Sequence, residues 1–425
     1  MSTYLFIILL IYLAVSLFNY SLEYLNISHM RKYGNTVPAE MEGHVDRDLL
    51  SSIRDYTIER TRFGIVSSAI NSIILLIFIF GGVLNAYNSW ISSLGLSTII
   101  SGILFFLLLV YAEMVISAPF SLYRTFVIEK KYGFNKMTVS LWITDQFKSL
   151  FITSIMLSAL LAGGLWIFEN SPALWWLWLW IFFFVFSIFV MYISPYVLEP
   201  LFNKFVPLED EALEVDISSV MSKVGIKVSK VFMMDASKRS THTNAYFSGI
   251  GKVKRIVLFD TLLKMLGKNE ILAVLAHEAG HWKRKHILKF ILLTEAIALM
   301  AFYISFHLVS SDVLTIVFNI DIATVYVKAV LIGFLGSIAL FPLTPLFHML
   351  SRKHEKEADD FSTDITGDAE GMIMSLIKLS KDNLSNLHPH PLYSAFHYSH
   401  PPVIERIRRL KGSIDPGPVS TDSTG

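Results

Sequence analysis

The stretch from residue 277 to residue 281 reads His-Glu-Ala-Gly-His, and the interpretation of the whole chain begins with it. His277 and His281 are four residues apart, so on a helix they lie on one face about one turn from each other. Two imidazoles in this arrangement can bind one zinc ion, and Glu278 beside them can take a proton from a metal-bound water. The same pattern also occurs in ordinary helices, so the rest of the chain must decide between a metal site and a plain helix.

The composition is that of a protein with several membrane spans. The chain has 425 residues, a formal net charge of +1 and 53% hydrophobic residues, and its mean hydropathy of +0.53 is too high for a soluble protein. No excess of basic residues indicates nucleic acid as a partner. The chain contains no cysteine, so a zinc site must use histidine and carboxylate ligands.

Seven apolar stretches are long enough to cross a bilayer. They lie near residues 4–25, 64–86, 96–123, 147–168, 173–199, 286–310 and 322–349. The first lacks the basic start of a signal peptide, so we interpret it as a span. The loops after the first and third spans are rich in lysine and arginine, whereas three loops, 87–95, 169–172 and 311–321, contain neither. The positive-inside rule therefore places the N-terminus outside and the basic loops in the cytosol.

The sequence predicts an α-helical integral membrane protein with a small α+β subdomain of the zincin type on the cytosolic side. Its expected parts are spans one to five, the soluble-like segment, spans six and seven, a C-terminal helical catalytic segment and a disordered tail. In the same order, they cover residues 1–202, 203–285, 286–349, 350–411 and 412–425.

Within the soluble-like segment, the pattern predicts a helix at 211–224 and strands near 230–235, 244–248 and 255–260, with a turn at 249–252. A further helix, expected to begin at residues 268–270, carries the two histidines. An edge strand of such a sheet can bind the backbone of a peptide substrate.

A zinc hydrolase also needs a third protein ligand and an open position for water. Glu355 and Asp359, just after the seventh span, are one helical turn apart. Glu355 can bind the metal, while Asp359 accepts a hydrogen bond from a ligand histidine and fixes its tautomer. His354 and Glu357 are rival ligands, and a solvated helix end would explain the same run of charges.

Two further features could act on a peptide. His397 and His400 precede a double proline, and either could donate to the oxyanion that forms during amide hydrolysis, or cap the helix that follows. Asn244 could hold a substrate carbonyl, or it could be an ordinary turn residue.

Three charged residues, Glu113, Glu295 and Lys328, fall within the expected spans. A charge at membrane depth is costly and usually faces a polar interior. We therefore expect that some spans line a water-filled space, with snorkelling at span ends as the alternative for Glu113 and Lys328.

Taken together, these stretches resemble the type I CAAX prenyl endopeptidases, integral-membrane zinc metalloproteases of the a-factor converting enzyme type. The matching segments follow the family's order over most of the chain. They are residues 128–136, 200–205, 237–247, 254–263, 275–282, 351–359 and 397–402. This combination is far more specific than the histidine motif alone.

The resemblance implies seven transmembrane helices around a water-filled chamber, with one zinc ion at its cytosolic end. By position, the zinc ligands are His277, His281 and Glu355, and the general base is Glu278. The resemblance also implies that Asp359 supports the ligands and that His400 donates to the oxyanion. The implied substrate-binding residues are Asn244, Ala245, Tyr246 and Arg406.

The family removes the last three residues of prenylated proteins, so the expected partners are a peptide or protein substrate, prenylated or not, and membrane lipid. One alternative is a quality-control zinc protease for membrane proteins that needs no prenyl group. Another is an inactive membrane transporter or scaffold. The absence of cysteine and the short loops favour a bacterial member in the inner membrane; a eukaryotic member would lie in the endoplasmic reticulum membrane.

Overall fold

The computed structural model describes residues 2–248 and 253–414, and helices make up most of it. Seven helical stretches in this part of the chain are long and apolar enough to span a membrane, which confirms the expected number. Their helices are α1 (Thr3–Tyr33), α2 (Arg47–Phe80), α4 (Thr98–Tyr123), α5 (Val139–Asn170), α6 (Trp175–Ile193), α11 (His286–Ser310) and α13 (Val325–Leu340).

Prolines mark irregular turns at the ends of two spans. Pro195 lies in a π-helical turn, Ser194–Leu198, after α6, and Pro342 lies in a 3₁₀ turn, Phe341–Leu343, after α13. Proline lacks the N–H that a regular helix needs, so such sites bend the chain without ending it. The chain therefore continues from α13 into α14 (Thr344–Thr366), which leaves the spanning region for the metal site.

A four-stranded sheet and three helices form the subdomain that the sequence predicted. The strands are β1 (Phe205–Pro207), β2 (Lys227–Met234), β3 (Ala245–Ser248) and β4 (Val253–Phe259), in the order β1-β2-β4-β3. Only the β2–β4 pair is parallel, and β3 is an edge strand. The helices are α8 (Glu211–Val224), α9 (Asp260–Met265) and α10 (Lys268–Lys283). The prediction missed β1, and the turn expected at 249–252 lies outside the described residues.

Shorter helices complete the described chain: α3 (Val83–Ser93), α7 (Glu199–Phe202), α12 (Val313–Phe318), α15 (Ala369–Asp382), α16 (Pro391–His397) and α17 (Val403–Ile414). The expected start of the disordered tail at residue 412 is wrong, because α17 continues to Ile414. The apolar residues Ile404, Ile407 and Leu410 bury one face of this helix.

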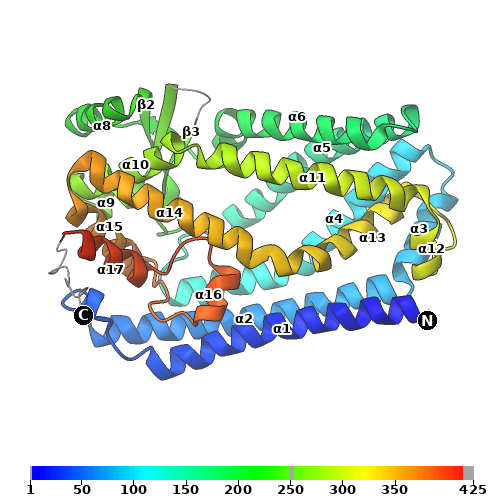
Figure 1. Ribbon diagram of the computed structural model, residues 1–425, viewed down its shortest axis with the longest axis horizontal. Coiled ribbons are helices and arrows are strands. Elements are labelled where there is room, and N and C mark those ends of the chain that lie inside the picture. The colour runs from blue at the N-terminus through cyan, green and yellow to red at the C-terminus, as the bar shows by residue number, and fades with distance from the viewer. Residues whose placement is uncertain (1, 249–252, 415–425) are drawn as a thin grey trace, which may run out of the picture.

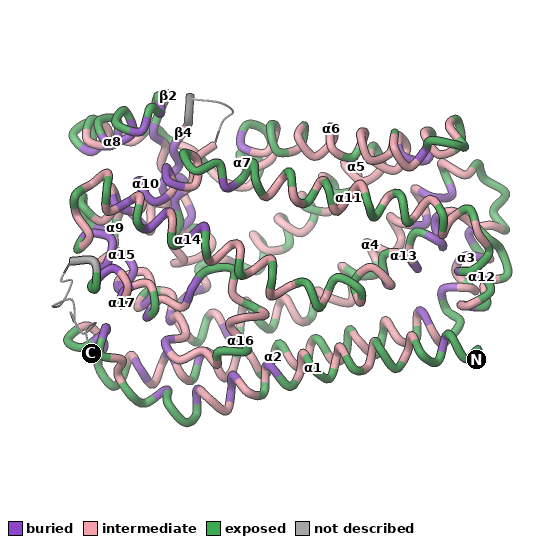
Figure 2. The backbone as a smooth tube through the Cα atoms, viewed as in Figure 1, coloured by how far each residue is buried: buried purple, intermediate pink, exposed green. Residues whose placement is uncertain are grey.

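The long helices run side by side between two ends of the molecule (Figure 1). The sheet, α8, α10, α15 and α17 gather at one end, and the N-terminus, α3 and α12 lie at the other. Buried residues concentrate in the subdomain, whereas the spanning helices are largely exposed or half-buried (Figure 2). This distribution fits helices whose outer faces contact lipid instead of protein.

The charged residues of the spans behave differently from one another. Lys328 is buried, and its Nζ donates to the carbonyl oxygens of Val309 at 2.7 Å and Ser311 at 2.8 Å, at the end of α11. The snorkelling alternative is therefore wrong for Lys328. Glu113 is exposed, and one buried carboxylate oxygen of Glu295 has no hydrogen-bond partner among the described residues.

Helices α10 and α14 approach each other closely at Gly280. A Cβ atom added to Gly280 would lie 3.1 Å from Ala358 Cα and 3.2 Å from the Phe361 side chain. The missing side chain and the small Ala358 let the two backbones come together. This crossing places Glu355, one turn before Ala358, opposite the histidines of α10.

We predict that Gly280→Val weakens the metal site. The larger side chain would push α14 away from α10, and a metal site requires its ligands within about 0.2 Å of their proper distances. Overpacking of this kind also costs about 1–3 kcal/mol of stability. The measurements are metal content and thermal unfolding in detergent.

The matched control for this variant is Gly336→Val in α13, where an added Cβ meets no atom within 4 Å. If Gly280→Val bound metal as tightly as Gly336→Val, the close crossing would not matter for the site.

Candidate metal centre

The local sequence explains why α10 presents its histidines to α14. The Glu270 side chain accepts a hydrogen bond from the Gly267 N–H at 2.6 Å, which caps the start of the helix. Leu275, Ala276 and Ala279 are buried in the core shared with the sheet. With this face fixed against the sheet, the histidines point away from it, toward α14.

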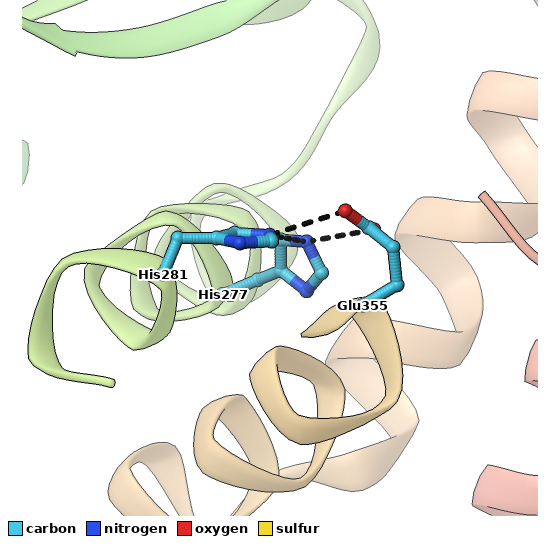
Figure 3. Close-up of side chains that lie close together, drawn as sticks. All are labelled: His277, His281 and Glu355. Atoms are coloured by element: carbon cyan, nitrogen blue, oxygen red, sulfur yellow. Dashed lines mark hydrogen bonds and ion pairs between the residues drawn. The ribbon is translucent and has the colours of Figure 1, made fainter. Parts of the chain in front are cut away.

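His277, His281 and Glu355 converge from two helices that are far apart in the sequence (Figure 3). The two Nε2 atoms lie 3.2 Å apart. Glu355 Oε2 lies 3.4 Å from His277 Nε2, and Glu355 Oε1 lies 3.3 Å from His281 Nε2. The side chain of Glu355 is only 6% exposed, and its Oε2 has no hydrogen-bond partner among the described residues.

These separations fit a tetrahedral zinc ion. Zinc bonds of about 2.0–2.2 Å at tetrahedral angles place neighbouring donor atoms about 3.3–3.6 Å apart, within about 0.1 Å of the separations found here. A buried carboxylate oxygen without a hydrogen-bond partner is costly unless a cation completes it. Two imidazole nitrogens and a carboxylate therefore form a donor set suited to zinc. Neither His354 nor Glu357, the rival ligands, belongs to this group.

The outer nitrogen of His277 contacts a buried ion pair. His277 Nδ1 lies 2.9 Å from Asp359 Oδ1, as the sequence predicted for a supporting carboxylate. Arg406 donates two hydrogen bonds to the same carboxylate, from Nε to Oδ2 at 3.0 Å and from Nη2 to Oδ1 at 2.6 Å. Asp359 can only accept, so His277 carries its proton on Nδ1 and directs the lone pair of Nε2 at the metal position.

The structure gives Arg406 a role in addition to the expected one. Its side chain is 11% exposed, and its third nitrogen, Nη1, lies 3.8 Å from Glu355 Oε2. Because Asp359 accepts from its Nε and Nη2, Arg406 supports the ligand His277 indirectly, through Asp359. Arg406 also lines the cavity that includes His400, so its assignment to substrate binding stays a prediction.

His281 is supported by a second chain of contacts. His281 Nδ1 lies 3.1 Å from His286 Nδ1, and His286 Nε2 lies 3.0 Å from Glu357 Oε2. The carboxylate requires a proton on His286 Nε2, so His286 Nδ1 accepts from His281 Nδ1–H, which leaves His281 Nε2 free for a metal. His354 stacks on His286 with ring centroids 4.0 Å apart.

The sequence interpretation missed His286. It lies five residues after His281 and beyond the end of α10, where Lys285 turns the chain with a φ of 56°. Helical spacing therefore gives no reason to place it beside His281. The excess of histidines around this motif was the one signal available.

Glu278 is half-buried next to the cluster. Burial raises the pKa of its carboxyl above the usual value, while the nearby His277 and His281 act in the opposite direction. A carboxylate with a raised pKa suits a group that takes up a proton and later releases it.

The structure also separates the two candidate oxyanion donors. His400 Nε2 lies 3.4 Å from Glu355 Oε1, and its side chain is 63% exposed, so it can reach a bound group. His397 instead stacks on Tyr393 with centroids 4.4 Å apart. The geometry brings His400, and not His397, to the metal cluster.

The predicted peptide-binding residues lie at the start of β3, which neighbours α10. Asn244 is exposed, and its Oδ1 accepts from the Ala245 N–H at 2.8 Å. The Ala245 side chain is buried, and the Tyr246 hydroxyl donates to Glu199. At the strand edge, Ala245 and Tyr246 can offer a substrate their backbone, and the Tyr246 side chain also lines the large apolar cavity that includes His281.

Two cavities flank the cluster. One, of about 1400 Å³, includes His281 in its wall and is mainly apolar, with Phe183, Phe186, Met191 and Phe247 among its residues. The other, of about 740 Å³, includes His400 and is lined by many polar groups. The metal position thus lies between an apolar and a polar space.

We predict that His286→Ala lowers the affinity for zinc by about 10–100-fold, because His281 would lose the contact that fixes its tautomer. His286→Asn, whose amide can still contact His281, should lose less. The measurement is zinc affinity by competition with a chelator, with His307→Ala at the far end of α11 as the control. Equal affinity in all of these variants would show that His286 does not orient His281.

Comparison with known proteins identifies the family. Residues 26–204 match the family described as CAAX prenyl protease N-terminal, five membrane helices, and residues 207–414 match peptidase family M48. CAAX prenyl protease 1 of Saccharomyces cerevisiae is 35% identical over 427 residues, 93% of each chain. The Arabidopsis thaliana homologue is 34% identical over 392 residues, 89% of this chain and 91% of that one.

A crystal structure shows the same fold. That of S. mikatae Ste24p superimposes with a TM-score of 0.89 at 32% identity, covering 96% of this chain and 99% of that one. Together, these matches cover both the membrane helices and the metal cluster. The chain therefore belongs to the M48 family of membrane metallopeptidases that includes the CAAX prenyl proteases.

Proposed function

We propose that this membrane metalloendopeptidase uses one Zn²⁺ ion, held by His277, His281 and Glu355, to cleave prenylated protein C-termini. The observation that carries the proposal is the cluster itself. Its three donor groups have mutual separations close to those of a tetrahedral zinc site, and the buried Glu355 Oε2 has no hydrogen-bond partner among the described residues.

When bound in such a site, zinc lowers the pKa of a water to about 7 and polarises the carbonyl of the scissile bond. Glu278 takes the proton of the attacking water and later gives it to the leaving amine. His400 donates to the oxyanion of the tetrahedral intermediate. The free edge of β3 pairs with the peptide backbone, and Asn244 holds one of its carbonyls.

The apolar cavity beside His281 supports a lipidated substrate. Its wall contains phenylalanines from α6 and Phe247 from β3, so a prenyl group could enter it while the peptide follows the strand. An unfolded membrane protein, the substrate of the quality-control alternative, has no need of one large apolar pocket beside the metal. A complete ligand set argues against an inactive transporter or scaffold.

The cytosolic side is proposed for the active site. The loops rich in lysine and arginine belong to the same end of the molecule as the metal cluster, which supports this orientation under the positive-inside rule. Membrane lipid is the expected surrounding, and nucleic acid is not an expected partner. A bacterial inner membrane and an endoplasmic reticulum membrane stay alternative locations.

A comparison of three substrates tests the proposed specificity. A farnesylated CAAX peptide, the same peptide without the prenyl group and a misfolded membrane protein are incubated with the purified protein. We expect rapid cleavage of the farnesylated peptide after its modified cysteine. Preferential cleavage of the misfolded protein would contradict the proposal and favour quality control.

We predict that Glu278→Gln keeps the metal but reduces turnover by about 100-fold or more, because the amide cannot accept the proton. The measurements are metal content per chain and the rate of farnesyl-peptide cleavage. Glu211→Gln, an exposed change at the start of α8, is the control. A near-normal rate in Glu278→Gln would refute Glu278 as the base.

A further inference from the structure

The polar cavity beside His400 contains a cation that the proposed mechanism does not use. Arg60 of α2 lies in its wall together with His400 and Arg406, and it also borders a second polar cavity of about 580 Å³ between the spans. An arginine that faces such a space attracts anions electrostatically.

Arg60 differs from two other cations of this cavity, Arg406 and His242, because it forms no direct ion pair with a described carboxylate; the charge of Glu129 reaches it only from beyond 4.0 Å. Arg406 is held by Asp359. His242 Nε2 lies 3.8 Å from Glu129, and its Nδ1 contacts Asn383 at 2.6 Å.

Among the described residues, no carboxylate oxygen lies within 4.0 Å of the Arg60 guanidinium. Its recorded contact is with the Tyr56 side chain, whose ring centroid is 5.9 Å from Cζ. Glu23, a carboxylate in the same wall, interacts instead with Tyr393.

One segment of the chain connects this cavity to the apolar one. His242 lines the polar cavity, whereas Tyr246, Phe247 and Ser248 line the apolar cavity. A peptide paired with the free edge of β3 would therefore have one end in each cavity, with the metal cluster between them. If this peptide runs antiparallel to β3, its C-terminal residues lie toward His242 and the polar cavity.

The size of the polar cavity suits a leaving group of three residues. Three extended residues span about 10 Å, at about 3.3 Å per residue. A cavity of about 740 Å³ is within the usual range for a bound small ligand. The free C-terminus of the leaving tripeptide carries a carboxylate, and a guanidinium binds a carboxylate through two parallel hydrogen bonds.

We propose that the polar cavity binds the three residues released from the substrate and that Arg60 binds their terminal α-carboxylate. The inference rests on the proposed function, because it assumes cleavage three residues from a free C-terminus. With the C-terminal carboxylate bound to Arg60, the bond three residues before the chain end lies at the metal. The enzyme would therefore cleave near free C-termini in preference to internal sequences.

Two farnesylated peptides that differ only at the C-terminus, one a free acid and the other an amide, test the proposal. Loss of a charged hydrogen-bond partner corresponds to a change of about 10-fold or more in affinity. We expect the wild-type KM to be lower for the acid by that factor. In Arg60→Ala, the KM for the acid should rise to that of the amide, while cleavage of the amide stays unchanged.

Two further variants separate charge from structure. Arg60→Lys should keep part of the preference for the peptide acid over the amide. An ammonium group retains the positive charge but cannot make the two parallel hydrogen bonds of a guanidinium. Arg62→Ala is the matched control: it lies on the same helix, in the wall of a different groove beside Asp48 and Glu59, and should behave as wild type. Unchanged cleavage of the amide shows that Arg60→Ala is folded.

A binding measurement gives a readout that does not depend on turnover. In Glu278→Gln, a fluorescent peptide acid should bind more tightly than its amide, and adding Arg60→Ala should abolish the difference. Equal use of acid and amide by the wild type would overturn the inference alone, as would an equal effect of Arg60→Ala on both. Cleavage of neither peptide would overturn the proposed function and the inference with it.

Discussion

The close crossing of α10 and α14 is the constraint on which the site depends. Gly280 allows α14 to approach until an added Cβ would lie 3.1 Å from Ala358 Cα, and this contact brings Glu355 to the two imidazoles. The remaining geometry follows from it. Helix α14 continues from the seventh span, so the metal position is held at the end of the membrane helices, where the soluble-like sheet meets them.

Each ligand histidine has its own support. His277 relies on Asp359, which Arg406 holds through two hydrogen bonds, and His281 relies on His286 and Glu357. Both supports fix the proton on the outer nitrogen and leave Nε2 free for a metal. Because α17 supplies Arg406 and α11 supplies His286, the site draws together elements that are separated by most of the catalytic half of the chain.

Local pattern predicted the spans, the strands β2, β3 and β4, and the helix of the histidine motif, because hydropathy and periodicity are properties of neighbouring residues. It could not choose among His354, Glu355 and Glu357, because that choice depends on how α14 packs against α10. Spacing also could not reveal that Arg406 contacts Asp359, because α17 and α14 meet only in the folded chain. The strand β1 was missed because its three residues, which end in a proline, are too few to show alternation.

The central claim is that His277, His281 and Glu355 hold one zinc ion between an apolar and a polar cavity. Anomalous diffraction from crystals of the purified protein, measured on both sides of the zinc absorption edge, tests it most directly. The claim predicts one peak per chain, within about 2.0–2.2 Å of both Nε2 atoms and of a Glu355 oxygen. A peak bound by other residues, or no zinc peak in active protein, would contradict it.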